Sequence, residues 1–372
     1  MNFELTDEQQ QLADSVAKML ASDYAFEKRQ SIVRSASGFS DTAWATFAEM
    51  GLLALALPEA DGGFGGGAMD LMATMEACGD ALVAEPLLDN IALGGRLVAH
   101  AGSAGQRTAH LPGLADGSRR IAVAYLEPGR RYSLDPQTTT ARRDGAHWVL
   151  EGAKCVVIGA QQAHSFVVSA RSAEGASLFI VDAKAAGLAL NPSRTVDGLR
   201  CADLQLTGVR LGDDALLGAA GSALPHIEEA VDFATALLCA DAMGAMRYAL
   251  DATLEYTKTR KQFGTPIASF QVLQHRMVEM LISLEQARSM AILAAAKVDA
   301  GGDARERGRA VSAAKIKIAD AARLISQESV QLHGGMGMTE ELKISHTFRR
   351  LTMAAQRFGD ADHHLQRYAA LA

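Results

Sequence analysis

Hydrophobic residues recur every three or four positions along three long stretches in the second half of the chain, residues 226–260, 270–300 and 307–335. This spacing is typical of amphipathic α-helices. Each stretch holds about 30 residues, so each predicted helix is about 45 Å long at 1.5 Å per residue. Long antiparallel helices joined by short links predict a helical bundle over residues 216–372.

Between residues 121 and 215 the pattern changes to short runs rich in β-branched residues. The runs are IAVAYL, HWVLEG, KCVVIG, SFVVSA, SLFIVD and LQLTGVRL, and glycine, aspartate or charged residues separate them. Such runs are typical of strands between turns. The pattern predicts a small β domain of six or more strands.

Residues 1–120 have the pattern of short helices. Thr6 followed by Gln9 predicts a capping box at the start of the first helix. A second helix is expected to stop near Gly51, and a third, LMATMEACGDALVAEPLL, is expected to break at Pro86. The glycines at residues 62–67, between the second and third helices, lack the preceding strand and following helix of a dinucleotide-binding loop. We therefore interpret them as a flexible turn. The predicted fold is mainly α with a β middle domain, in three parts: 1–120, 121–215 and 216–372.

Composition narrows the possible functions. Hydrophobic residues make up 49% of the chain and aromatic residues 5%, which favours a large, mostly helical core. The net charge of −7 makes nucleic acid an improbable partner. The four cysteines are scattered, which predicts reduced thiols in a cytoplasmic protein and no metal site. The N-terminus is polar and charged, which predicts that it is not a signal peptide. The sequence contains no run of 18 apolar residues, so no membrane-spanning helix is predicted.

The first segment that could carry chemistry is RKQFGTPIASFQ, residues 260–271, between two predicted helices. It can be interpreted as a plain interhelical turn at Gly264 and Pro266, with Ser269 capping the next helix. The alternative is a binding site, because Arg260 and Gln262 place a cation and an amide beside Phe263. A guanidinium next to an aromatic face suits a cofactor that carries both phosphate and a ring.

The second segment is VQLHGGMGMTEE, residues 330–341. One glycine after a long helix is typical of a C-cap. Three glycines within four positions are more than a cap requires, and they allow a ligand to approach the backbone closely.

Taken in order, these segments resemble the acyl-CoA dehydrogenase family over nearly the whole chain. The matching pieces are FELTDEQQQL, EMGLLALALPEADGGFGG, DGAHWVLEGAK, TRKQFGTPIASFQVLQHRMVEM and VQLHGGMGMTEE. The pair of motifs in the last two pieces is the most specific. The resemblance implies a helical N-terminal domain, a β-sandwich or barrel-like middle domain, a C-terminal four-helix bundle and an FAD cofactor.

The resemblance also implies roles for particular residues. One group would contact the FAD pyrophosphate of a neighbouring subunit, a second group the adenosine side, and a third group the flavin ring. These groups are, respectively, Arg260, Gln262 and Phe263; Gln331, Gly334 and Gly335; and Leu126 and Ile158. Gln271 is a further expected FAD-binding residue.

The β domain departs from the family pattern. The family has Thr-Glu-Pro followed by Gly-Ser-Asp, whereas this chain keeps only Glu127 and Pro128. The family's Trp-Ile-Ser/Thr is replaced by VVI at residues 156–158. Hydroxyls that contact flavin are therefore lost, although backbone amides can replace them. Either the flavin affinity is lower, or a partner subunit holds the flavin.

The chemistry implied by the resemblance needs a carboxylate that removes the α proton of a thioester. Most family members place a Glu in Tyr-Glu-Gly-Thr before the last helix, and a minority place it on the long helix. The minority position falls on Ala234. The majority position falls in RFGDADHH, on Asp360 when the last helix is aligned and on Gly359 when Arg350 is aligned.

We therefore predict Asp360 as the catalytic base. The alternative is that Gly359 and Asp360 form only a turn, with Asp362 capping the last helix. Adjacent positions on a helix face different ways, so His363 and His364 are expected to be surface residues and not ligands.

The long helix also indicates the kind of substrate. The family often has an Arg where this chain has Thr235, next to Ala234, which predicts a wider pocket. A bulky acyl-CoA, such as a steroid thioester, would use that room. Electrons would pass to an electron-transfer flavoprotein or a similar acceptor, and the assembly would be a homodimer, a homotetramer or a heterotetramer with a related subunit. Two alternatives stay open: a non-catalytic half-site subunit, and a flavin-free binding protein with the same fold.

Overall fold

The computed structural model describes residues 5–372 and divides into two compact units. One unit comprises residues 5–29, Ala68–Val83 and Thr235–Ala372, and the other comprises Gln30–Gly67 and Ala84–Ala234. Among the residues that the structure describes, no helix is long and apolar enough to cross a membrane.

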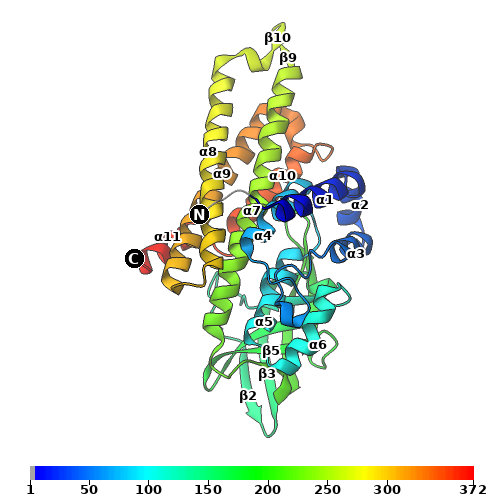
Figure 1. Cartoon of the computed structure of the whole chain (residues 1–372), viewed down its shortest axis with the longest axis vertical. Coiled ribbons are helices and arrows are strands. Elements are labelled where there is room, and N and C mark those ends of the chain that lie inside the picture. Colours follow the sequence, from blue (N-terminus) through cyan, green and yellow to red (C-terminus); the bar gives the residue numbers. More distant parts are fainter. Residues whose placement is uncertain (1–4) are drawn as a thin grey trace. The chain divides into compact units, whose positions relative to one another are not determined.

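The first unit is helical. Its helices are α1 (Asp7–Asp23), α4 (Ala68–Ala81), α8 (Gln271–Asp299), α9 (Ala304–His333), α10 (Lys343–Gln356) and α11 (Ala361–Ala370), together with most of α7 (Ala223–Thr259). The three long helices α7, α8 and α9 confirm the helices predicted from the hydrophobic spacing. Figure 1 shows α7 and α8 running in opposite directions, joined at one end by the β9–β10 hairpin.

Local capping fixes where α1 begins. The Thr6 side chain accepts the Gln9 N–H, and the Gln9 side chain accepts the Thr6 N–H, so the predicted capping box is confirmed. Gln9 also donates to Asp70 at 2.8 Å, which joins α1 to α4. Helix α4 in turn crosses α7 at two glycines, Gly79 and Gly244, where a Cβ would collide with backbone of the facing helix. The crossing therefore depends on residues that have no side chain.

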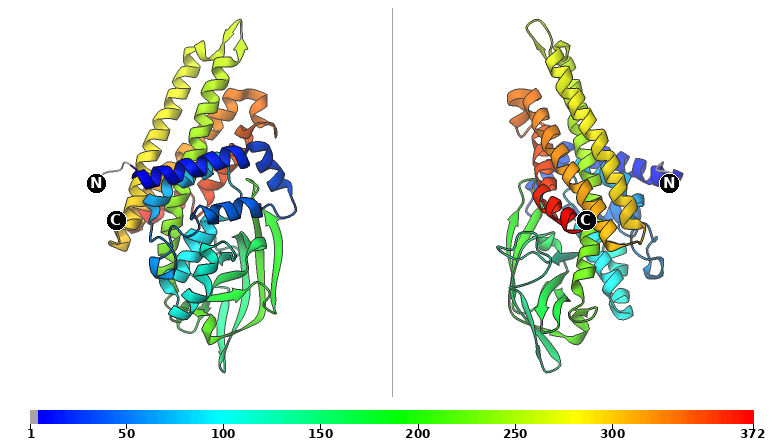
Figure 2. Two further views of the ribbon diagram at one scale, coloured as in Figure 1. Left: turned by 45° about the vertical axis from the view of Figure 1, so that its right-hand side comes forward. Right: turned by 90° about the vertical axis from the view of Figure 1, so that its left-hand side faces the viewer.

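The second unit is built around an eight-stranded sheet with the order β6-β7-β3-β2-β4-β5-β8, and β1 pairs with β4. The strands are β1 (Ile121–Ala124), β2 (Thr140–Asp144), β3 (His147–Ile158), β4 (Ser165–Ser172), β5 (Gly175–Asp182), β6 (Leu188–Arg194), β7 (Arg200–Gly212) and β8 (Leu216–Leu217). Helices α3 (Asp41–Glu49), α5 (Arg96–Ala101) and α6 (Ala104–Ala115) belong to this unit, as does most of α2 (Phe26–Arg34). Figure 2 shows the twist of the sheet in two views.

One face of the sheet is packed with apolar side chains. Trp148 and Phe179 meet edge to face with ring centroids 5.2 Å apart, and Phe166 and Val168 are fully buried beside them. The runs HWVLEG and KCVVIG form one strand, β3, whose pairing with β7 shifts register twice through bulges. The helical, β and helical order confirms the predicted fold class.

Two predicted helix ends are wrong. The helix expected to continue to Pro86 ends at Ala81, because Leu82 adopts a positive φ of 57° that an α-helix cannot contain. Ser269 does not cap α8: its hydroxyl donates to the Pro266 carbonyl within a short 3₁₀ turn, and Phe270 occupies the cap position without a side-chain bond. The helix predicted to stop near Gly51 does so, since α3 ends at Glu49.

Candidate cofactor and base site

The segment RKQFG forms the tip between α7 and α8. Strands β9 (Lys261–Gln262) and β10 (Thr265–Pro266) form a hairpin, and Phe263 and Gly264 both have positive φ at its turn, 54° and 80°. The Phe263 side chain is 94% exposed. Three neighbouring residues that are predicted to bind FAD are exposed as well, namely Arg260, Gln262 and Gln271. A guanidinium and an aromatic face therefore point to solvent from the same turn.

The glycines after α9 have different reasons to be glycine. Gly334 caps the helix with φ 61°, a conformation that favours glycine. A Cβ at Gly337 would come 2.7 Å from the Val330 carbonyl oxygen, so packing excludes a side chain there. A Cβ at Gly335 would meet nothing within 4 Å. Internal packing does not explain Gly335, whose backbone is exposed.

A stacked pair joins these two segments. Tyr256, one turn before Arg260, lies over His333 with ring centroids 4.3 Å apart and planes at 24°. The Tyr256 hydroxyl also donates to the His333 carbonyl at 3.3 Å. The imidazole Nδ1 lies 2.8 Å from the Ser329 carbonyl, and burial lowers the His333 pKa. Sequence reasoning missed this pair, although the aromatic residue one helical turn from Arg260 was a signal for it.

The predicted flavin-ring residues lie in the second unit. Leu126 is half-buried and Ile158 is buried. The Leu126 carbonyl accepts the Cys155 N–H at 2.9 Å, which ties the segment after β1 to the bulged part of β3. Val156, within that bulge, has a φ of 51° and donates its N–H to Asp203 at 2.9 Å. Backbone groups thus organise the two segments whose family hydroxyls are missing.

A buried ion pair lies directly after Leu126. Glu127 accepts the backbone N–H groups of three residues at 2.8–2.9 Å and the Lys154 ammonium at 3.0 Å; the three residues are Gln137, Thr138 and Thr139. Burial opposes ionisation of Glu127, but these hydrogen bonds and Lys154 together lower its pKa to about 2. Burial lowers the Lys154 pKa to about 8, against the attraction of Glu127.

Asp360 lies in the turn between α10 and α11. It is half-buried and lines a cavity of about 420 Å³ between these helices and α9. Its Oδ1 accepts the His363 N–H at 2.8 Å, so Asp360 is the N-cap of α11. The expectation that Asp362 caps the last helix is wrong, because Asp362 lies exposed within the first turn.

The interpretation of both histidines as surface residues is also wrong for His364, which is 1% exposed. Its Nε2 lies 3.1 Å from the Phe358 carbonyl, and its Nδ1 lies 3.2 Å from the Ser312 hydroxyl. Burial lowers the His364 pKa to about 3, and the nearby Lys315 adds to this, so the ring is neutral near pH 7. Because a carbonyl can only accept, we assign the proton to Nε2 and the hydroxyl hydrogen of Ser312 to Nδ1.

The minority base position on α7 carries no carboxylate. Ala234 and Thr235 are completely buried, as is Asp232 two residues earlier. The predicted residues therefore fall into separate groups: the hairpin tip and the α9 terminus, joined by Tyr256 and His333; the Asp360 turn; and the Leu126 and Ile158 pair in the other unit.

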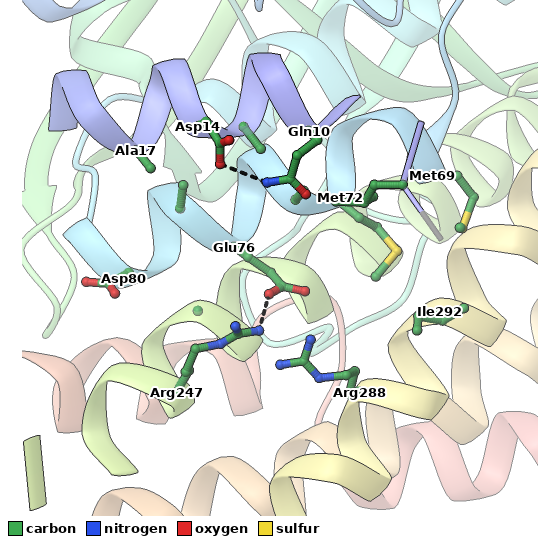
Figure 3. Close-up of a pocket in the computed structure, with 15 residues that line it drawn as sticks. Gln10, Asp14, Ala17, Met69, Met72, Glu76, Asp80, Arg247, Arg288 and Ile292 are labelled. Carbon is green, nitrogen blue, oxygen red and sulfur yellow. Dashed lines mark hydrogen bonds and ion pairs between the residues drawn. The ribbon is translucent and has the colours of Figure 1, made fainter. Parts of the chain in front are cut away.

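Another cavity of the first unit, about 380 Å³, is lined by none of the predicted residues. Figure 3 shows Glu76 of α4 facing Arg247 of α7 and Arg288 of α8, with Met72 beside them. Burial raises the Glu76 pKa, although the Arg247 guanidinium, 2.7 Å away, favours the charged form. This crevice holds the salt bridge between Glu76 and Arg247 and contains none of the predicted site residues.

Comparison with known proteins identifies the arrangement. Three family models match in order: the acyl-CoA dehydrogenase N-terminal domain at residues 6–118, its middle domain at 122–209 and its C-terminal domain at 224–370. The chain belongs to the acyl-CoA dehydrogenase family. Family membership confirms that the protein is an oxidoreductase of this class, whose cofactor is FAD.

Individual relatives agree with this assignment. The acyl-CoA dehydrogenase fadE12 of Mycobacterium bovis is 34% identical over 355 residues, which cover 92% of this chain and 90% of that protein. A variant of the Tcur3481–Tcur3483 steroid ACAD is 30% identical, with a TM-score of 0.89 over 98% of this chain and 97% of that chain. A glutaryl-CoA dehydrogenase of Mycobacterium smegmatis, in complex with FADH2, is 24% identical with a TM-score of 0.90 over 98% and 94% of the chains. The last likeness shows the fold.

Proposed function

We propose that the protein carries out α,β-dehydrogenation of an acyl-CoA thioester with FAD, and that Asp360 is the base. The observation that supports the base is a half-buried carboxylate beside a cavity, in the turn before the last helix. FAD, when bound, accepts a hydride from the substrate's β carbon. The Asp360 carboxylate takes the proton from the α carbon, so the substrate loses two hydrogens and gains one C=C bond.

The residues present fit FAD at the exposed end of the bundle. Arg260 can fork onto phosphate oxygens, and Phe263 beside it offers a ring face. The backbone at Gly334 and Gly335 has open space in front of it, which suits close approach by the adenosine part. All of these groups face solvent in one chain, so we assign them to the FAD of a neighbouring subunit, and Leu126 and Ile158 to the flavin ring.

The cap bond constrains how Asp360 acts. Oδ1 accepts the His363 N–H, and the proposal assigns the substrate proton to the second oxygen, Oδ2. A carboxylate that already accepts a backbone N–H is held in one rotamer, which favours positioning. Asp is one methylene shorter than the Glu of most family members, and Gly359 with its φ of 119° bends the turn that must supply the missing reach.

The test is a substitution that removes only the basic function. Asp360→Asn keeps a side-chain oxygen for the cap but cannot accept the proton. Dehydrogenation should fall by about 10²–10⁴-fold, the usual contribution of a positioned base. The measurement is anaerobic bleaching of the flavin absorbance on mixing with octanoyl-CoA or a ring-bearing acyl-CoA. Asp362→Asn is the matched control and should bleach normally.

A second candidate function is a half-site subunit whose base comes from a related partner chain. Two observations favour it: Asp360 serves as a helix cap, and Ala234 occupies the other position for a base. If this candidate is right, the wild-type protein should bleach only after the second subunit is added. Asp360→Asn should then bleach as fast as the wild type. The steroid ACAD to which the chain is similar has two components in its name, Tcur3481 and Tcur3483.

The substrate proposal is a bulky acyl-CoA such as a steroid thioester. It rests on the likeness to a steroid ACAD. Ala234 and Thr235, whose small side chains predicted a wider pocket, are completely buried in the single chain. We assign the electrons to an electron-transfer flavoprotein or a similar acceptor, and the compartment to the cytoplasm, where thiols such as those of the four cysteines stay reduced.

A further inference from the structure

A lysine is buried beneath the turn that carries Asp360. Lys315, in the middle of α9, has no exposed surface. Its ammonium donates to the Gly359 carbonyl at 2.7 Å and to the Ala355 carbonyl at 3.0 Å. Burying an ammonium group is unfavourable unless hydrogen bonds or a counter-charge compensate it, and here the two carbonyls provide that compensation.

A second buried side chain holds the same turn. His364 donates from Nε2 to the Phe358 carbonyl, and Ser312, one turn before Lys315 on α9, fixes the ring from its other side. Three carbonyls around the turn, those of Ala355, Phe358 and Gly359, are therefore bound by side chains at the α9 interface. These bonds replace the helical hydrogen bonds that the chain loses between α10 and α11.

The turn needs this support because its backbone is in uncommon conformations. Phe358 has a φ of 60°, and Gly359 follows with a φ of 119°. A positive φ is costly for a phenylalanine, and two in succession persist only where surrounding contacts hold them. A Cβ at Gly359 would lie 2.5 Å from the His363 ring and 2.8 Å from the His364 ring, so the histidines also fix the residue type.

We infer that Lys315 is a positioning residue: with His364 it holds the turn 356–360, so that Asp360 reaches the substrate at a fixed place. This inference rests on the proposed function, because it assigns a purpose to the position of Asp360. Lys315 acts through the turn and does not contact the substrate.

The first experiment measures the turn directly, without substrate. In the FAD-loaded oligomer, Lys315→Met keeps the apolar stem and removes the charge and the donors. Amide hydrogen exchange of the peptide covering residues 356–364 should then rise at least tenfold, while exchange in α8 stays unchanged. Lys317→Met, the same change at a half-exposed position two residues along α9, should leave both segments as they are. Unchanged exchange at 356–364 in Lys315→Met would overturn the inference.

The second experiment measures catalysis with octanoyl-CoA. Lys315→Met should lower kcat about a hundredfold, the effect of a small misplacement, with little change in KM. The value of kcat is taken per bound flavin, so a role of Lys315 in stability alone would leave it unchanged.

The two hypotheses fail in different ways. If Asp360→Asn still bleaches normally, the proposed base is wrong, and the exchange measurement alone decides whether Lys315 holds the turn. If Asp360→Asn is inactive but Lys315→Met keeps the wild-type kcat per bound flavin, the role of Lys315 is wrong and the base stands. Should Lys315→Met fail to fold, Lys315→Gln replaces it, since its amide NH2 can still donate to a carbonyl. That variant should show a smaller rise in exchange at 356–364 together with a lower kcat, and wild-type values of both would contradict the inference.

Discussion

At the scale of single residues, the glycines after α9 separate three physical requirements. Gly334 is required by its positive φ and Gly337 by the closeness of Val330, whereas open space surrounds Gly335. Only Gly335 therefore distinguishes a binding role from a structural one.

Gly335→Ala should leave the protein folded and weaken its hold on FAD. The added methyl group meets nothing within the chain, so the free energy of unfolding should change by less than about 0.5 kcal/mol. The same methyl group would stand where the adenosine part is proposed to approach. The measurement is the flavin-to-protein absorbance ratio after gel filtration, together with urea unfolding. Gly337→Ala should have the opposite effects: the added methyl group contacts Val330 and lowers the free energy of unfolding, while the FAD content of the folded protein stays the same.

Glu127 gives a prediction about acid stability. Its pKa is about 2 in the folded protein, against an ordinary value of 4.5, so the unfolded chain takes up a proton at higher pH than the folded protein does. The stabilisation is fully present above about pH 4.5 and is lost as the pH falls from there toward 2. Urea unfolding followed between pH 6 and pH 2.5 should show this loss.

Glu127→Gln should remove that part of the pH dependence and lower stability at pH 7 by about 3–5 kcal/mol, because it leaves the Lys154 ammonium buried without its counter-charge. Glu151→Gln, at an exposed position of β3, is the control and should change stability by less than about 0.5 kcal/mol. A destabilisation of equal size in both variants would contradict the ion-pair explanation.

At the scale of elements, the start of α11 separates two roles of Asp360. Asp360→Ser keeps a cap oxygen but no carboxylate, and Asp360→Ala removes both. Asp360→Ala should cost about 1 kcal/mol through loss of the cap, whereas Asp360→Ser should be nearly neutral. Both should lose dehydrogenation equally. If activity followed stability across the two variants, Asp360 would be a cap only.

The elements that sequence reasoning predicted are those fixed by local signals. The long helices follow from apolar spacing, and α1 follows from Thr6 and Gln9. Strand β6 was missed because it lies at the sheet edge, is mostly exposed and contains Pro192, which an edge strand tolerates. Strand β2, TARRD, has mainly polar residues and is recognisable only by its partners, β3 and β4.

The site shows the same division. The motif at the α7–α8 tip could be recognised because its turn chemistry is local. The burial of Lys315 and His364 could not, because it depends on α9 packing against a turn about 45 residues later in the chain. The cap role of Asp360 is a local bond to the His363 N–H, and it was missed because Asp362 was expected to be the cap. A lysine on an amphipathic helix is normally expected to face solvent. Only the tertiary contacts of Lys315 show that it is buried.

At the scale of the whole molecule, one face of α8 indicates assembly. Three apolar side chains on this face are each about half exposed: Val278, and Leu281 and Ile282 about one turn further along. The exposed Phe263 extends from the hairpin at the same end of the helix. Apolar side chains grouped in this way typically mark a protein interface. The proposed FAD contacts of Arg260 and Gly335 need the same assembly, because they would complete the site of a neighbouring subunit.

The Val278→Glu/Ile282→Glu double variant should therefore dissociate into a smaller species and lose FAD at the same time. Two carboxylates on this face cannot be buried without partners, so association should weaken by several kcal/mol, while the buried side of α8, with Met277 and Met280, remains intact. Sedimentation at micromolar concentration should give a smaller species, and flavin content should fall with it. Glu279→Gln/Glu285→Gln, at exposed positions of the same helix, is the control and should keep both assembly and flavin.

Arg260→Ala completes the comparison, because it should release flavin while the oligomer persists. A double variant that is monomeric but retains its full flavin content would show that each subunit binds FAD alone, and the assignment of Arg260 to a neighbouring subunit's cofactor would be wrong.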